Sequence, residues 1–293
     1  MPRRRAGTPS SASPELKEAL MTSPEWRQTT ITFPDPHAAD HVAITQLAPI
    51  LTEAETRQLL TAWFYVRKDA WRLRYLPAST TAEADHYLTG QLDHLRHDRH
   101  ISAAVPGIYE PETHAFGGTT AMHAAHQLWH HDSRHLLTPA TGKTSARHRE
   151  LSIMLAAAMM RAAGLDWYEQ GDVWACVADH RDPPEPAAVG TLLPSVKRLL
   201  TVDTASLMHQ GAPLAAAGTW CDAYIAAGDT LNRLNRTGRL RRGLRAILAH
   251  HVIFAWNRRS IPGLHQAALA TAAKTTILGP DPTHSCPTSD GEL

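Results

Sequence analysis

The sequence has little cysteine, no long hydrophobic run and almost no net charge, and each shortage excludes a class of protein. The three cysteines, Cys176, Cys221 and Cys286, are odd in number and far apart, so they form neither a CxxC motif nor a disulfide framework. A reducing cytoplasm is therefore the expected location. No run of about 18 apolar residues is present, so no transmembrane helix is expected. A formal net charge of +1 gives no general attraction to nucleic acids or membranes, and any anion recognition must be local.

The two ends of the chain are polar and are expected to be disordered tails, over residues 1–25 and 278–293. The first of them opens with a basic stretch that no apolar segment follows, which is not the pattern of a signal peptide. Between the tails the chain is long enough, and with 43% hydrophobic residues apolar enough, to bury a full core.

The stretch from Trp63 to Pro77 has the pattern of a β-hairpin. Residues 63–66 favour strands, residues 68–69 supply a polar turn, and apolar residues then alternate with Arg72 and Arg74. Residues two apart on a strand point to the same side, so the two arginines share one face. Their guanidinium groups stay charged at physiological pH and match carboxylate or phosphate geometry. The pattern alone leaves two interpretations open, a solvated outer face and an anion-binding pair.

The first half of the chain, residues 26–118, predicts the order β-α-β-β-α-β. Residues 26–33 read as a strand that ends at a Pro-Asp-Pro turn, and residues 38–60 as a helix with a break near Pro49. After the hairpin, residues 82–97 predict a second helix and residues 101–110 an extended segment. This is the ferredoxin-like order, in which two helices cover one face of an antiparallel sheet.

The second half, residues 119–277, is predicted to be helical. Apolar residues recur at helical spacing over 121–137, 146–164, 168–180, 192–201, 219–237 and 240–259, and more weakly over 264–277. Gly164 and Gly238 stand where helix C-caps belong, and residues 181–186 read as a Pro-rich linker. The expected fold is therefore α+β, a ferredoxin-like half followed by a helical half that shares its core.

Seven short motifs follow one another along the chain and carry a family resemblance. They are Trp-Arg-Gln at 26–28, the hairpin at 63–75, Tyr-Glu-Pro-Glu-Thr-His-Ala-Phe-Gly-Gly at 109–118, His-Asp-Ser-Arg-His at 131–135, Arg-Glu-Leu-Ser at 149–152, Asp-Trp-Tyr-Glu at 166–169 and His-His-Val-Ile-Phe-Ala-Trp-Asn-Arg at 250–258. In this order they resemble the thiopeptide-type bacteriocin biosynthesis proteins, which are similar to the C-terminal glutamate-elimination domain of class I lanthipeptide dehydratases. The resemblance extends from about Trp26 to Ile277.

The resemblance implies two chemistries. Stand-alone members of the elimination type act on a ribosomal precursor peptide whose Ser or Thr has been glutamylated from Glu-tRNA by a partner protein. They expel glutamate to leave dehydroalanine or dehydrobutyrine, a carbon–oxygen lyase reaction without a metal or organic cofactor. Divergent relatives, the pyridine synthases of thiopeptide pathways, join two dehydroalanines in a formal aza-[4+2] cycloaddition and release the leader peptide. Elimination is our first hypothesis, the pyridine synthase is the second, and a non-catalytic helper subunit of a split dehydratase is the third.

The resemblance also implies where an anion would bind. In the family an arginine pair on this hairpin strand is implicated in elimination, and Arg72 and Arg74 occupy that position. A glutamyl leaving group carries one free carboxylate and departs as a second one, which suits arginine. Many members have an arginine directly before the aromatic-Gly-Gly of the third motif, where this chain has Ala115 with His114 beside it. Either His114 or another cation compensates, or this protein does not eliminate glutamate.

The family's acid/base candidate is a late histidine that is followed by Asn-Arg on a helix. His251 is the nearest match and His250 is the alternate, and a pKa near neutrality suits proton transfer. A packed or helix-capping histidine is the competing interpretation for each. Trp71 and Tyr109 are further candidates for contacts with the substrate.

Five histidines on the expected helix 121–137 raise the question of a metal: His123, His126, His130, His131 and His135. Two of them are four residues apart, but no HExxH pattern and no carboxylate or cysteine set completes a site, so a histidine-rich polar face is expected and no metal.

The expected partners are a precursor peptide, leader plus core, and a separate tRNA-dependent glutamylating protein. No basic stripe marks a tRNA surface, so no direct contact with nucleic acid is expected, and none with a membrane. Homodimerisation through the helical half stays open. We also expect the leader to dock by strand addition at an exposed sheet edge.

Overall fold

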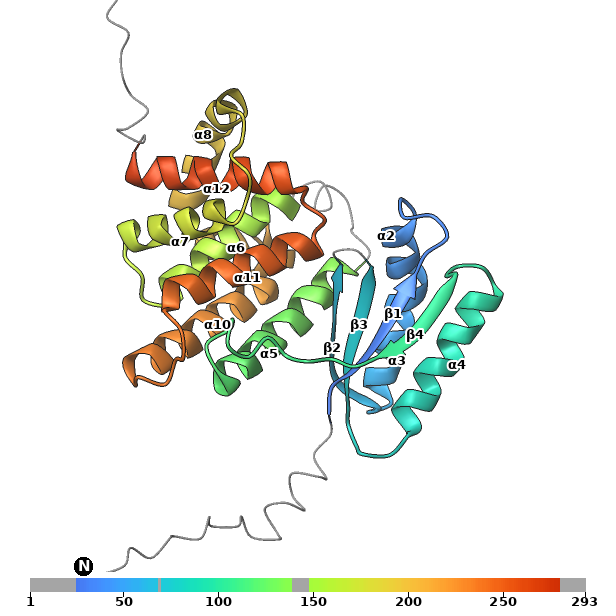
Figure 1. The fold of residues 1–293 in the computed structure, drawn as a ribbon. Helices are drawn as coiled ribbons and strands as arrows, with labels where there is room; N and C mark the ends of the chain where they lie inside the picture. The colour runs from blue at the N-terminus through green and yellow to red at the C-terminus, as the bar shows by residue number, and fades with distance from the viewer. Residues whose placement is uncertain (1–24, 68–69, 139–147, 280–293) are drawn as a thin grey trace, which may run out of the picture.

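The structure is a computed structural model that describes residues 25–67, 70–138 and 148–279 (Figure 1). The two tails that the sequence predicts fall almost wholly outside these residues. A four-stranded antiparallel sheet has the order β2-β3-β1-β4. Its strands are β1 (Arg27–Thr32), β2 (Leu60–Arg67), β3 (Trp71–Pro77) and β4 (Ala103–Gly107). This is the ferredoxin-like order, so the predicted fold class is confirmed.

Helices cover one face of this sheet (Figure 1). They are α2 (Ala39–Val42), a π-helical turn (Ala43–Leu47), α3 (Ala48–Thr56) and α4 (Glu83–His97). The expected break near Pro49 is absent, because the π-helical turn leads directly into α3 and Pro49 lies in the first turn of α3. The Ala48 N–H bonds the Ala43 carbonyl five residues back, so the π-helical turn has already changed the α-helical hydrogen-bond pattern next to the missing N–H of Pro49.

The helical part contains every helix that the sequence predicted, with shifted ends. These helices are α5 (Thr119–Leu136), α6 (His148–Ala162), α7 (Trp167–Asp179), α8 (Pro186–Thr201), α10 (Gly218–Arg236), α11 (Leu244–Arg258) and α12 (Gly263–Leu278). The sequence missed the short α9 (Thr204–Met208) and a 3₁₀ turn (Ala215–Ala217). Gly164 and Gly238 both have positive φ after a helix end, as C-cap glycines do. None of the helices in the described part is long and apolar enough to cross a membrane.

One contiguous core joins the sheet to the helices, as expected. Helix α5 runs along the outer edge of β2 and supplies the hydrogen-bonding groups that a neighbouring strand would otherwise provide. His130 Nδ1 lies 3.2 Å from the Trp63 nitrogen, and the Tyr65 N–H donates to Ser133 Oγ at 3.3 Å. This edge is therefore closed to an added strand, and β4 forms the other edge of the sheet. The fixed contact between the two parts places residues of β3 opposite residues of α11 and α12.

Candidate active site

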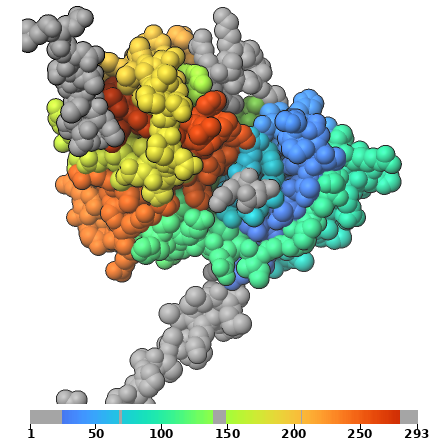
Figure 2. All heavy atoms as spheres, turned by 45° about the horizontal axis from the view of Figure 1, so that its top comes forward, coloured from blue at the N-terminus to red at the C-terminus, as the bar shows by residue number. Residues whose placement is uncertain are grey.

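A cleft of about 810 Å³ lies between the sheet and the helical part. Its sheet wall is formed mainly by β3, with Arg72 and Arg74. Its helical wall is formed by Arg181 after α7, by His250 on α11 and by Gln266 on α12, together with their neighbours. Figure 2 shows the face of the molecule on which the C-terminal helices, in red, meet the strands of the hairpin, in cyan.

The cleft has a strongly positive lining. Four arginines reach it, and Glu112 is the single acidic residue among the described lining residues. Arg67 is neutralised by an ion pair with Asp40. Arg72, Arg74 and Arg181 form no ion pair with any described residue, which leaves uncompensated positive charge on both walls. Such a site attracts an anion, and a carboxylate matches the guanidinium fork.

The sheet wall follows from the alternation of β3. Trp71, Leu73 and Tyr75 are buried against the helices, and Arg72 and Arg74 are half-buried on the opposite face, as the spacing predicted. Antiparallel pairing then fixes the neighbours of Arg74, which are Gln28 on β1 and Phe64 on β2.

Arg74 is held by neutral groups only. Its Nε donates to Gln28 Oε1 at 2.8 Å, and its guanidinium lies over the rings of Tyr109 and Phe64 at 4.1 and 5.6 Å. The Tyr109 hydroxyl lies 2.8 Å from His126 Nε2, which fixes the ring beneath the cation. Burial lowers the pKa of Arg74, Tyr109 and the carboxylate of Glu112 partly oppose that shift, and the charge of Arg72 adds to it. A desolvated cation in this state is stabilised when an anion binds. Tyr109, expected as a substrate contact, thus supports Arg74 from below.

The sequence ranked His251 first and His250 as the alternate, and the structure places only the alternate in the cleft. His251 is only 2% exposed and packs its ring against Phe116 and Trp129, at 4.9 and 6.5 Å between ring centroids. Burial lowers the pKa of His251 to about 3, so the imidazole is neutral. It does not reach the cleft. Of the two predicted acid/base candidates, only His250 lines it.

His250 carries its lone pair on Nε2, which the donor Arg242 Nη1 approaches to 3.4 Å and has to leave before the imidazole accepts a proton. Its Nδ1 lies 3.1 Å from the Ala246 carbonyl oxygen, a contact in which Nδ1–H donates, and this assigns the lone pair to Nε2. Partial burial lowers the pKa of His250, and the Arg242 guanidinium, 3.4 Å from the ring nitrogens, lowers it further. The ring of His180, which also lines the cleft, lies 5.4 Å away between centroids. A neutral imidazole in a cationic cleft has the protonation state of a general base.

The third motif is arranged differently from the expectation. His114 is exposed and faces a separate hollow beside Arg239 and Arg241, so it does not supply a cation to the cleft. The Ala115 carbonyl instead accepts a hydrogen bond from Arg242 Nη1 at 3.1 Å. The cation beside Ala115 is therefore Arg242, from the segment before α11.

Trp71, a further predicted substrate contact, is largely part of the core. It is 7% exposed, stacks on Tyr65 with 4.5 Å between ring centroids, and is also one of the residues that line the cleft.

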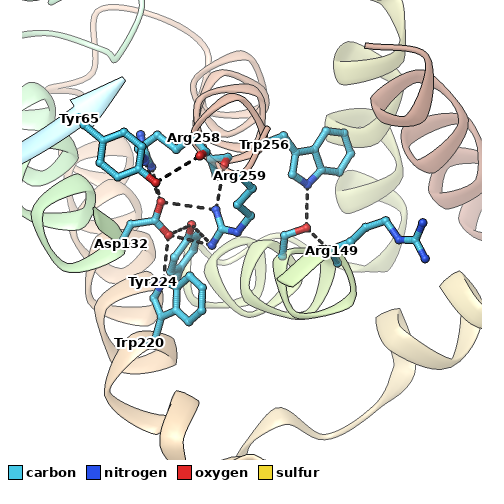
Figure 3. A network of polar contacts seen from close by, with 10 residues as sticks. Tyr65, Asp132, Arg149, Trp220, Tyr224, Trp256, Arg258 and Arg259 are labelled. Carbon is cyan, nitrogen blue, oxygen red and sulfur yellow. Dashed lines mark hydrogen bonds and ion pairs between the residues drawn. The ribbon is translucent and has the colours of Figure 1, made fainter. Parts of the chain in front are cut away.

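A buried ionic cluster, which the sequence did not indicate, joins α5, α10 and α11 (Figure 3). The carboxylate of Asp132 is 0% exposed, and it accepts from Arg258 at 2.7 Å and from Arg259 at 2.8 Å. Trp220 Nε1 and the Tyr224 hydroxyl also donate to it, both at 2.8 Å. Burial alone would raise the pKa of Asp132, but the two arginines hold it below its usual range.

Other side chains of helix 121–137 have packing roles. His130 bonds the Trp63 backbone and lies 3.4 Å from Glu55, and His126 contacts Tyr109. Among the described residues no group of three potential metal ligands comes together.

Residues 26–277 match the family model described as "Lantibiotic biosynthesis dehydratase C-term". The fold is similar to that of the tRNA-dependent lantibiotic dehydratase MibB from Microbispora sp. 107891, at 17% identity and a TM-score of 0.57 over 86% of this chain. The chain spans only 28% of the MibB chain. It is also similar to TsrL, at 14% identity and a TM-score of 0.58, over 87% of this chain and 94% of TsrL.

These identities are low, so the two likenesses show the fold alone. No curated protein matches the sequence. The family model nevertheless covers nearly the whole described part of the chain. With a ferredoxin-like sheet, a helical part and the cationic cleft between them, the chain belongs to the family of lantibiotic biosynthesis dehydratase C-terminal domains.

Proposed function

We propose that this protein eliminates glutamate from glutamylated Ser or Thr residues of a ribosomally made precursor peptide and leaves dehydroalanine or dehydrobutyrine. Membership of the lantibiotic dehydratase family supports a role in peptide dehydration. The observation that carries the finer proposal is the pairing, in one cleft, of arginines without a carboxylate partner among the described residues and a neutral histidine.

The proposed reaction uses each wall of the cleft for one task. His250 Nε2 removes the α-proton of the modified residue, and the electron pair of that C–H bond becomes the Cα–Cβ double bond. The bond from Cβ to the ester oxygen breaks, and glutamate leaves as a carboxylate with the electrons of that bond. Arg72 and Arg74 stabilise the departing negative charge.

Asn257 is the candidate for stabilising the enolate that develops when the α-proton leaves. Its Oδ1 accepts from Gln266 Nε2 at 3.1 Å, which leaves its amide NH₂ group as a donor in the cleft. A donor at the peptide carbonyl oxygen lowers the energy of the enolate.

The proposed substrate implies two partners, a precursor peptide with leader and core, and a separate tRNA-dependent glutamylating protein. The proposed substrate already carries glutamate, and the proposal names a separate tRNA-dependent protein as its source; MibB, a tRNA-dependent lantibiotic dehydratase of similar fold, supports the link to tRNA.

The test is mass spectrometry of a defined glutamylated peptide after incubation with the purified protein. The proposal expects loss of glutamate and formation of a dehydroamino acid, abolished by His250→Phe and retained by the matched variant His251→Phe. A glutamylated peptide that stays intact with the wild-type protein would overturn the proposal.

Ala115 favours one alternative, the formal aza-[4+2] pyridine synthase. Ala115 stands at the position where the resemblance leads us to expect an arginine in glutamate-eliminating members. A peptide with two dehydroalanines, offered to the same preparation, separates the two functions, since a cyclase would release the leader peptide. Loss of dehydration on deleting the protein, with no effect of Arg72→Ala and Arg74→Ala, would instead indicate a helper subunit.

A further inference from the structure

Arg181 is held at three of its nitrogens on the helical wall of the cleft, and neither its spacing nor any motif indicated a function for it. Its Nε and Nη2 donate to Gln266 Oε1 at 3.0 and 2.6 Å, and its Nη1 donates to the His180 carbonyl at 2.7 Å. A guanidinium held at three nitrogens has lost most of its rotamer freedom before any ligand arrives.

Gln266 is itself fixed, which makes it a firm support. It is 3% exposed, and its Nε2 donates to Asn257 Oδ1 at 3.1 Å and to the Ile261 carbonyl at 2.8 Å. Both donor contacts define which end of the amide is oxygen, so Oε1 necessarily points at Arg181. The contact between Asn257 on α11 and Gln266 on α12 thus anchors Arg181 to two helices of the helical wall.

The partners of Arg181 orient it without neutralising it. A guanidinium has five N–H donors, and the three hydrogen bonds above leave two unused. All three acceptor contacts are made with an amide or a carbonyl oxygen, and Arg181 forms no ion pair with the described residues. A buried glutamate at position 266 would fit the same space and cancel the charge. The chain has glutamine there.

Arg181 lies across the cleft from the arginines of the sheet wall. Arg181 and Gln266 line the cleft that Arg72 and Arg74 line from the other side. The cleft thus offers positive charge from two walls to one ligand. Glutamate has a carboxylate at each end, and a ligand of that kind is matched by cations on opposite walls.

We propose that Arg181, oriented by the buried amide of Gln266, is a second carboxylate-binding residue of the cleft and holds the carboxylate of glutamate that Arg72 and Arg74 do not hold. This inference rests on the proposed elimination of glutamate and names a residue that binds the leaving group. Arg181 is a binding residue in this account, and Gln266 is a positioning residue.

The test measures binding of three probes by calorimetry to the full-length protein: L-glutamate, L-glutamine and 4-aminobutyrate. The last two each lack one carboxylate, so the wild-type protein should bind both more weakly than glutamate. Arg181→Gln should weaken glutamate binding by about tenfold or more, as expected for the loss of a charge-assisted contact. It should leave the affinity for one of the two monocarboxylate probes unchanged, namely the one that lacks the carboxylate held by Arg181.

Gln266→Glu keeps Arg181 and supplies a carboxylate inside the wall, although it also loses the Nε2 donor that bonds Asn257 Oδ1 and the Ile261 carbonyl. It should reproduce the loss seen in Arg181→Gln. Gln266→Met, which removes the orienting oxygen without adding charge, should weaken glutamate binding less than Gln266→Glu does. Arg198→Gln, at an exposed position on α8, is the charge-matched control and should bind all probes as the wild type does.

Different results would overturn this inference and the proposed function. If the wild type eliminates and binds glutamate, and Arg181→Gln and Gln266→Glu bind it equally well, Arg181 has no role in binding and the elimination stands. If the wild-type protein neither releases nor binds glutamate, both proposals fall. Should Arg181→Gln not fold, Gln266→Met decides in its place, because it removes the orienting oxygen and adds no charge; unchanged glutamate binding in that variant then overturns the inference.

Discussion

Two pairs of arginines in this molecule have opposite surroundings. Arg258 and Arg259, with side chains 1% exposed, converge on the carboxylate of Asp132 (Figure 3). Arg72 and Arg74 lie half-buried beside a cleft, and Arg74 is held by an amide and two aromatic rings. The difference shows that the same side chain serves the fold when its counter-ion is built in, and is available to a ligand when only neutral groups hold it.

The largest expected effect is a loss of unfolding free energy when the buried arginine pair loses its counter-ion. Asp132→Asn removes the counter-ion of two buried guanidinium groups, and removal of one partner from a buried pair costs about 3–5 kcal/mol. Urea denaturation should show this loss of unfolding free energy. The control is Asp172→Asn, whose carboxylate forms a half-exposed ion pair with Arg245 at 3.3 Å. Exposed pairs contribute about 0–1 kcal/mol, so equal losses in the two variants would contradict the contrast.

The second largest expected effect is a loss of activity when the arginine pair of the cleft loses Arg74. Arg74→Gln should lower kcat/KM for glutamate release by about a hundredfold, because charge-assisted hydrogen bonds contribute about 1.5–3 kcal/mol each. Its unfolding free energy should change little. Arg96→Gln, at an exposed position on α4, controls for the change in net charge. A large loss of stability with unchanged elimination would reverse the assignment of the two pairs.

A third prediction sharpens the comparison through pH. The pKa of His251 falls from an ordinary value of about 6.5 to about 3 in the folded protein, because burial disfavours the charged imidazole. Between pH 6.5 and pH 3 the imidazole of His251 is therefore protonated in the unfolded chain and neutral in the folded protein. The contribution of His251 is full above pH 6.5 and is lost as pH falls toward 3, at up to about 1.4 kcal/mol per pH unit.

His251→Phe should flatten the pH dependence of the unfolding free energy over that range by this amount. His250→Phe should abolish elimination while flattening the dependence less. Equal slopes for wild type and His251→Phe, measured by urea denaturation between pH 4 and 6, would refute the buried neutral state.

The smallest expected effect concerns the support of Arg74. Gln28→Leu removes the oxygen that holds Arg74 Nε at 2.8 Å, and should lower kcat/KM by about tenfold. Gln127→Leu, at an exposed position on α5, is the matched control. If both variants act as the wild type does, the aromatic rings alone orient Arg74.

The sheet wall of the cleft could be predicted from the sequence, because its information is local. A period of two over five residues placed Arg72 and Arg74 on one face, and the order of elements gave the sheet. The helical wall could not be predicted in this way. Arg181 and Gln266 are 85 residues apart and meet only through the packing of α7 against α12.

Two further misses have equally physical causes. His250 and His251 are adjacent on α11, a helix that is apolar on most of its surface, so its periodicity did not show which histidine faces the core. Asp132 lies in a run of polar residues, and its partners are 88–127 residues away in the sequence. Charge burial of this kind has no local pattern.

The most direct test of the contrast between the two arginine pairs is a titration with L-glutamate, followed by NMR of ¹⁵N-labelled arginine Nε groups assigned by substitution. We expect the Nε signals of Arg72 and Arg74 to shift with saturation, while those of Arg258 and Arg259 stay in place. Shifts confined to the pair on Asp132, or no shift in any of the four, would contradict it.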